Sequence, residues 1–154
     1  MKLSRGENIT LVDAGGVESN DKYVEVINWS SAGLSVSTGT AYGVTYISMT
    51  GTDPSTSPYV LSLAAPIVGV EKTIMLDSTA AYINTIDIDL GAGVGVDGTT
   101  SNRFIAFSTL ATVQQTVVLV GITTGLWGVK SVETTSGGFG VAAGIRAVTA
   151  ARAS

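Results

Sequence analysis

The sequence predicts an all-β protein: a single β-barrel or β-sandwich domain, jelly-roll or tulip-like, with extended terminal arms. Three observations support this. Val, Ile, Thr and aromatic residues, which suit a pleated and half-buried surface, dominate the chain, while strong helix formers such as Glu, Lys and Gln are scarce. Turn-forming clusters recur at short intervals, and some segments alternate between apolar and polar residues. A length of 154 residues fits one domain with a substantial core.

Clusters of Gly, Asp, Asn, Ser, Thr and Pro divide the chain at residues 14–21, 51–58, 91–102 and 134–140. The segments between them predict strands at Asn8–Asp13, Lys22–Trp29, Gly33–Thr38, Val44–Met49, Tyr59–Ala64, Val68–Asp77, Ile83–Leu90, Arg103–Leu110, Val113–Gly121 and Leu126–Val132. We expect Gly33–Thr38 and Val44–Met49 to pair as a hairpin across the GTAYG segment. Pro66 cannot donate to a strand ladder, so it marks an edge or a bend.

Two strands have a distinctive pattern. Within Ile83–Leu90 the side chains of Ile86, Ile88 and Leu90 share one face, and those of Thr85, Asp87 and Asp89 share the other, which predicts one buried and one wet face. The segment Val117–Val120 is continuously apolar and predicts a strand covered on both faces, by the core and by a partner.

No internal repeat or linker divides the chain, so residues 1–154 form one domain. Residues 1–21 are a candidate N-terminal arm. The Ala-rich stretch 141–154 is compatible with a short helix or an extended arm, and we favour a C-terminal arm. In an assembly protein such arms drape over a neighbouring subunit.

The low charge content and high hydrophobic content of the chain bear on which partners it can have. Hydrophobic residues make up 45% of the chain and charged residues 13%, about half the usual share in a soluble domain. No run of about 18 apolar residues exists, so we expect no membrane partner. A net charge of −4 with scattered basic residues argues against direct nucleic-acid binding. A surface with so few charges predicts that much of it is buried in contacts with neighbouring subunits. The alternative is a monomer whose surface is covered by Thr and Ser side chains.

The residue types limit the chemistry as well. The chain has no Cys and no His, which removes thiolate ligands, disulfides and the commonest general base and metal ligand. We therefore predict no catalytic residue, no metal and no cofactor. Gly93, Gly95 and Gly98 form a literal GxGxxG, but a dinucleotide site needs a helix next, and the following residues are strand-like. We interpret this segment as a Gly-rich hairpin turn.

Asp87 and Asp89 lie two residues apart, near Asp97. Paired carboxylates bind Ca²⁺ or act as acid and base, but an extended DID segment lacks the bent backbone of a calcium loop. We favour a solvated face, or a cross-strand or inter-subunit pair with Arg103.

Aromatic residues make up 6% of the chain and are dispersed, so they are better read as core or interface anchors than as a sugar-stacking platform. Trp127 stands between Gly125 and Gly128, where small neighbours leave room for its ring. The candidate interface residues are Trp29, Tyr59, Asp87, Asp89, Arg103 and Trp127.

Three segments in the second half of the chain resemble a known class of protein: PYVLSLAAPIVGVEKTIMLDSTAAY, NTIDIDLGAGVGVDGTTSNRFIAFSTL and TVVLVGITTGLWGV. They are similar in style to the decoration, cement or minor capsid proteins of tailed bacteriophages. This resemblance implies a β-barrel or β-sandwich, often a homotrimer, made in the host cytoplasm and bound to the outer capsid surface of the virion. Its partner there would be the major capsid protein, whose subunits it bridges to stabilise the shell.

Two other functions stay open at this point. A phage tail or head-fibre component would also be rich in β structure and trimeric. A carbohydrate- or surface-binding β module would instead use exposed Tyr and Trp side chains. An enzyme is the least favoured class, because such an enzyme would depend on Asp and Glu alone.

Overall fold

The structure is a computed structural model. It describes residues 11–13, 16–18, 24–29, 35–49, 59–78, 86–107, 115–133 and 145–149. Throughout these ranges the regular structure is β and contains no helix, which confirms the all-β prediction. None of these ranges holds a helix with the length and hydropathy of a membrane span.

The strands in chain order are β1 (Leu11–Asp13), β2 (Gly16–Glu18), β3 (Val24–Trp29), β4 (Ser35–Gly39), β5 (Gly43–Met49), β6 (Tyr59–Leu63), β7 (Glu71–Ser78), β8 (Ile86–Asp89), β9 (Gly95–Val96), β10 (Phe104–Phe107), β11 (Gln115–Thr123), β12 (Leu126–Glu133) and β13 (Arg146–Val148). β1 and β2 pair with each other as an antiparallel hairpin. The hairpin lies within the predicted N-terminal arm, and the rest of residues 1–21 lies outside the described residues.

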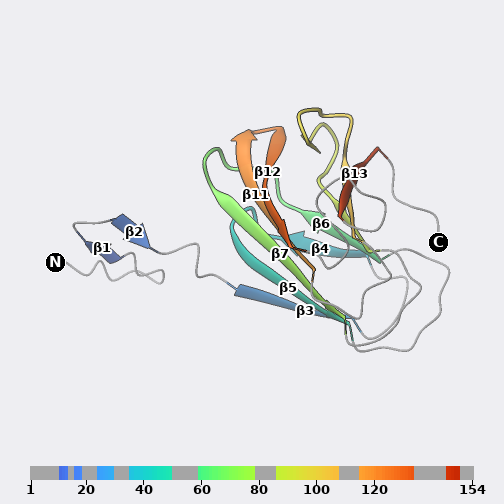
Figure 1. Cartoon of the computed structure of the whole chain (residues 1–154), viewed down its shortest axis with the longest axis horizontal. Helices are drawn as coiled ribbons and strands as arrows, with labels where there is room; N and C mark the ends of the chain where they lie inside the picture. Colours follow the sequence, from blue (N-terminus) through green and yellow to red (C-terminus); the bar gives the residue numbers. More distant parts are fainter. Residues whose placement is uncertain are drawn as a thin grey trace.

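The remaining strands form two sheets that enclose one core (Figure 1). One sheet has six strands in the order β3-β5-β7-β11-β12-β9, and the other has five in the order β13-β10-β8-β6-β4. Buried side chains from both sheets join in a single cluster, with Ile74 and Leu119 on one side and Leu61 and Ile105 on the other. This is a sandwich arrangement, and among the described strands neither sheet closes into a barrel.

From β3 to β8 the chain changes sheet at every strand. β3, β5 and β7 therefore lie side by side and parallel in one sheet, and β4, β6 and β8 do so in the other. A jelly roll is built from antiparallel strands, so these parallel ladders set this sandwich apart from the expected jelly-roll order. Within these two sheets the antiparallel pairs involve the later strands: β10 pairs with β8 and β13, and β11 pairs with β7 and β12, whereas β9 pairs parallel with β12.

The predicted hairpin between Gly33–Thr38 and Val44–Met49 is wrong. β4 pairs with β6, β5 pairs with β3 and β7, and the two strands belong to different sheets. The residues between them cross the sandwich instead of folding back within one sheet, and Gly43 has a φ of 72°, a left-handed conformation that glycine adopts at low cost. A short connection flanked by glycines is compatible with a hairpin within one sheet and with a crossing between two sheets, so the local sequence did not distinguish the two arrangements.

Two other predictions are refined. Pro66 lies in the connection from β6 to β7, which changes sheets, so it marks a bend. Val117 and Leu119 are buried, whereas Val118 and Val120 on the opposite face are half-buried. β11 is therefore covered completely on its core face and only in part on its outer face.

The predicted C-terminal arm, residues 141–154, contains β13. This strand pairs antiparallel with β10 and forms an edge of the five-stranded sheet. Residues 141–144 and 150–154 lie outside the described residues.

Candidate functional site

The strongest polar cluster in the described structure lies where the edge strand β3 meets β5, β7 and the connection between β4 and β5. Here Lys72 of β7 has no solvent exposure at all, although lysine is almost never fully buried without a partner. Lys72 shares its strand face with Ile74 and Leu76, which belong to the core. The strand thus aims a charged side chain into the inside of the sandwich.

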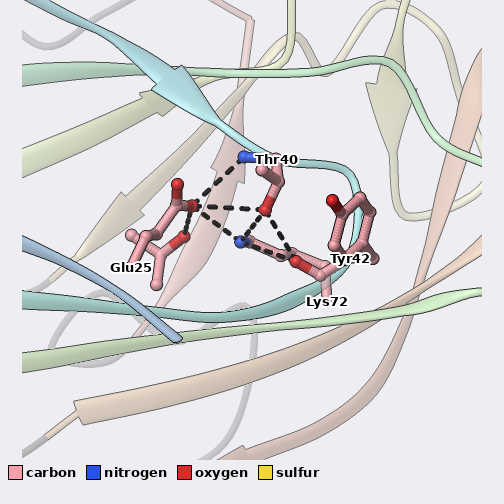
Figure 2. Close-up of polar contacts among 5 residues, drawn as sticks. Glu25, Thr40, Tyr42 and Lys72 are labelled. Atoms are coloured by element: carbon pink, nitrogen blue, oxygen red, sulfur yellow. Dashed lines mark hydrogen bonds and ion pairs between the residues drawn. The ribbon is translucent and has the colours of Figure 1, made fainter. Parts of the chain in front are cut away.

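The buried ammonium of Lys72 has three acceptors (Figure 2). Its Nζ donates to Glu25 Oε1 at 2.9 Å, to Thr40 Oγ1 at 3.0 Å and to the Tyr42 carbonyl oxygen at 3.1 Å. An ammonium group has three N–H bonds, so every donor is used. In this state Lys72 has no lone pair to act as a base or nucleophile, and the geometry is that of an anchor for a carboxylate.

The Glu25 carboxylate comes from β3, the edge strand of the six-stranded sheet. Besides Lys72, its Oε1 accepts the backbone N–H of Thr40 at 3.1 Å and the hydroxyl of Thr45. Thr40 in turn donates its hydroxyl to the Tyr42 carbonyl at 2.7 Å. We call the site that binds this carboxylate the Lys72 socket: the Lys72 ammonium, Thr40 and the Thr45 hydroxyl, together with the Tyr42 carbonyl that accepts from Lys72 and Thr40.

The electrostatics of the pair follow from its burial. The side chain of Glu25 keeps 15% exposure and that of Lys72 keeps none. Burial raises the pKa of Glu25, but the hydrogen bonds from Thr45, Lys72 and Thr40 and the charge of Lys72 outweigh it, so its pKa lies below the ordinary value. Burial lowers the pKa of Lys72, and Glu25 offsets this loss only in part. The three acceptors around Lys72 Nζ fit an ammonium group, and with the lowered pKa of Glu25 the geometry is that of an ion pair.

A second polar contact joins two of the predicted site residues. Arg103 Nε donates to Asp89 Oδ1 at 2.7 Å and Arg103 Nη2 to Asp89 Oδ2 at 2.6 Å, and the Gly91 N–H also donates to Oδ1. Burial raises the pKa of Asp89, but these hydrogen bonds outweigh it and lower the pKa overall. The guanidinium also lies 5.1 Å from the centroid of the Phe104 ring. The predicted pairing of Asp89 with Arg103 is confirmed, as a contact within one chain.

Asp87 does not lie on a wet face. Its exposure is 0%, so the predicted solvated face of β8 is wrong at this position. The neighbouring Ala106 of β10, opposite Asp87 in the register, is also fully buried. The physical reason is that this part of the outer face of the five-stranded sheet is covered, and a period of two in the sequence does not reveal whether a polar face is covered.

The other predicted residues do not join these contacts. Trp127 of β12 is fully buried in the core, opposite Gly121, and its Nε1 has no hydrogen-bond partner among the described residues. It is a core anchor and not a platform for a ligand. Trp29 ends β3 opposite Met49, and Tyr59 begins β6 opposite Ile86; their side chains lie outside the described residues.

The GxGxxG segment is explained by backbone packing, and the chain continues into strand β10. Asp97 and Gly98 both have positive φ and close a tight turn between the bridged residues Val96 and Thr99. A Cβ on Gly95 would lie 2.1 Å from the carbonyl oxygen of Thr99, so only glycine fits there. The segment connects the antiparallel strands β8 and β10, as in the predicted hairpin, but it is more than a turn, because its Gly95–Val96 forms β9 and pairs with β12 of the other sheet.

Sequence reasoning missed the Lys72 socket. The available signal was phase: Lys72 alternates in step with Ile74 and Leu76, and Glu25 alternates in step with Ile27, which also packs against the core. A lysine and a glutamate that each occupy the apolar phase of a strand indicate a buried pair. Among the described residues, no three His, Cys, Asp or Glu side chains group as metal ligands.

Comparison with models of known protein families finds none that matches this chain, and no curated protein sequence matches it either. Function must therefore be argued from the residues themselves.

Proposed function

We propose that this chain is a structural protein of a phage virion, which binds the outer capsid surface as a homotrimer and stabilises the shell by bridging major capsid subunits. The observation that supports this best is the open edge of β3. Two of its side chains, Val24 and Val26, are exposed at 56% and 57% and point away from the core. Its one charged residue, Glu25, is turned inward and neutralised by Lys72.

Edge strands of soluble proteins usually carry outward charges, Pro or bulges that prevent pairing with other chains. Among the described strands β3 pairs only with β5, and its sequence VEVINW offers none of these devices on its outward side. The N–H and C=O groups along its edge, which pair with no other described strand, and its exposed valines are suited to accept an added strand from a partner, the β-augmentation mode of recognition. This favours a role in assembly.

A low charge content supports the same role. Charged residues make up 13% of the chain, so a large contact area can be buried without the cost of desolvating many ions. Weak contacts repeated by symmetry give tight attachment through effective concentration. A shell-stabilising protein needs such an area and needs no catalyst.

The test is binding of the purified chain to preformed phage capsids that lack it, compared with binding to unassembled capsid subunits. We expect a trimer by native mass and saturable binding to the capsids alone. Val26→Lys, which places a charge on the edge, should weaken this binding, and Val68→Lys, at a site that is 60% exposed but away from β3, should not. Equal binding to free subunits, or no binding to capsids, would contradict the proposal.

A further inference from the structure

The edge strand β3 is attached to the rest of the sandwich by few contacts, and the Lys72 socket supplies one of them. β3 contributes little to the core: its outward valines are more than half exposed, and of its described side chains only Ile27 packs against the core cluster. The described contacts that hold it in place are the parallel ladder to β5, from Val24↔Val44 to Trp29↔Met49, and the Glu25 carboxylate in the socket.

The socket is specific for a carboxylate. Lys72 is completely buried, and an unpaired buried ammonium is costly, so the socket requires a counter-charge. Three donors, the Lys72 ammonium, the Thr40 N–H and the Thr45 hydroxyl, converge on one oxygen of Glu25. Any strand placed beside β5 must present an acidic side chain at this register, and β3 does so at Glu25. The charge complementarity therefore selects β3, from whichever copy supplies it.

The connection after β3 is short. β3 ends at Trp29 in the six-stranded sheet and β4 begins at Ser35 in the five-stranded sheet, so residues 30–34 join strands of opposite sheets. Sheets packed face to face lie about 10 Å apart. The six steps from Trp29 to Ser35 reach at most about 20 Å, which is enough to join β4 to a β3 in its own sandwich or in an adjacent copy. Exchange of such an element has a low cost, because the same contacts form with a neighbour's strand.

We propose that the Lys72 socket accepts Glu25 from a second copy of this chain, so that β3 strands are exchanged between the subunits of the assembly. In a ring, each copy gives its β3 to the next and receives one from the previous copy, which closes the symmetry without leaving a socket empty. This inference rests on the proposed self-assembly but not on the location in a virion.

Cysteine cross-linking tests the exchange directly, because the chain has no Cys of its own. Val24 and Val44 are direct neighbours in the β3–β5 ladder, so a chain carrying Val24→Cys and Val44→Cys forms a disulfide wherever β3 meets β5. Exchange predicts interchain disulfides, which give a covalent oligomer without reductant. Val26→Cys with Val44→Cys is the matched control, since a shift of two residues places the Cα atoms about 8 Å apart, too far for a disulfide.

An intrachain disulfide in the Val24→Cys/Val44→Cys protein would overturn the exchange. Native mass separates this failure from failure of the proposed function: a trimer with intrachain links refutes only the exchange, whereas a monomer refutes self-assembly as well. A single Val24→Cys chain is the second control: if it forms as much covalent oligomer as the Val24→Cys/Val44→Cys chain, the links arise between two β3 edges and the exchange is refuted.

A second arm tests the role of the carboxylate. In the same cysteine background, Glu25→Gln should lower the interchain cross-linked fraction about tenfold or more, because an amide leaves the buried Lys72 ammonium without a counter-charge. Thr45→Val removes one donor hydroxyl and serves as the milder variant if Glu25→Gln does not fold. An interchain fraction unchanged in both variants would overturn the role of the socket.

Discussion

Replacing Glu25 by Gln should destabilise the protein more than replacing Lys72 by Met, although both changes break the same ion pair. Glu25→Gln leaves an ammonium with no solvent exposure and no counter-charge: its acceptors are then all neutral, namely the amide oxygen of the introduced Gln, the Thr40 hydroxyl and the Tyr42 carbonyl. Removing one partner of a buried pair typically costs about 3–5 kcal/mol, and complete burial of Lys72 places this variant in that range.

Lys72→Met leaves a carboxylate that keeps 15% exposure and two other donors, the Thr40 N–H and the Thr45 hydroxyl. We expect a loss of about 1–3 kcal/mol, the usual cost of an incompletely satisfied polar group. The double variant removes both charges, so its loss should be smaller than the sum of the single losses by about 2 kcal/mol or more.

The assay is urea unfolding followed by tryptophan fluorescence, since Trp127 is fully buried and reports on the core. Protein concentration is kept fixed, because self-association adds to the measured stability. Lys130→Met is the matched control: its partner Glu71 lies on the same strand as Lys72, but both side chains are about half exposed, so the loss should be about 0–1 kcal/mol. A larger loss in Lys72→Met than in Glu25→Gln, or strictly additive losses, would refute this account of the socket.

Three further predictions follow from the described contacts. Burial raises the pKa values of Glu25 and Asp89, but the hydrogen bonds from their partners outweigh it, so both pKa values are lowered in the folded protein. The stability that these two ionised groups contribute is therefore present above their unfolded-state pKa values near pH 4, and it is lost as the pH falls through the lower folded-state values. Acid titration of Glu25→Gln, followed by circular dichroism, should show a smaller loss of stability over that pH window. Gly121→Ala should cost about 1–3 kcal/mol in urea unfolding, because the added Cβ would lie 2.1 Å from the carbonyl oxygen of Ile67; a change below about 0.5 kcal/mol would contradict this close approach. At a protein concentration low enough to keep both proteins monomeric, Val26→Lys should leave urea stability within about 0.5 kcal/mol, since the side chain is 57% exposed. At higher concentration it should reduce self-association in sedimentation measurements; unchanged association would argue against the β3 edge as a contact.

The sequence predicted much of the strand content, because local patterns carry it. The proposed strand Leu126–Val132 corresponds to β12, Leu126–Glu133, and the apolar face of Ile83–Leu90 is buried at Ile86, Ile88 and Leu90. A period of two identifies the face that meets the core, since burial of alternate side chains is a property of a single strand.

The pairing of the strands was not predictable in the same way. The residues between β4 and β5 have the composition of a hairpin turn, but they cross between sheets, and the choice depends on which strands pair on either side. The ion pair between Glu25 and Lys72 joins residues that are 47 positions apart. The two side chains come into contact only because of the register of two parallel ladders, β3 with β5 and β5 with β7. Only phase was visible in the sequence: each charged residue occupies the apolar phase of its strand.

The most direct test of the central claim, a structural role on the outer head of a virion, is the copy number of this chain in purified phage particles by quantitative mass spectrometry. A protein that bridges capsid subunits across the shell occupies the lattice repeatedly, so we predict on the order of hundreds of copies per particle. Absence from the particles, or a count of about six or twelve, which matches the symmetry of a tail or neck, would contradict the claim.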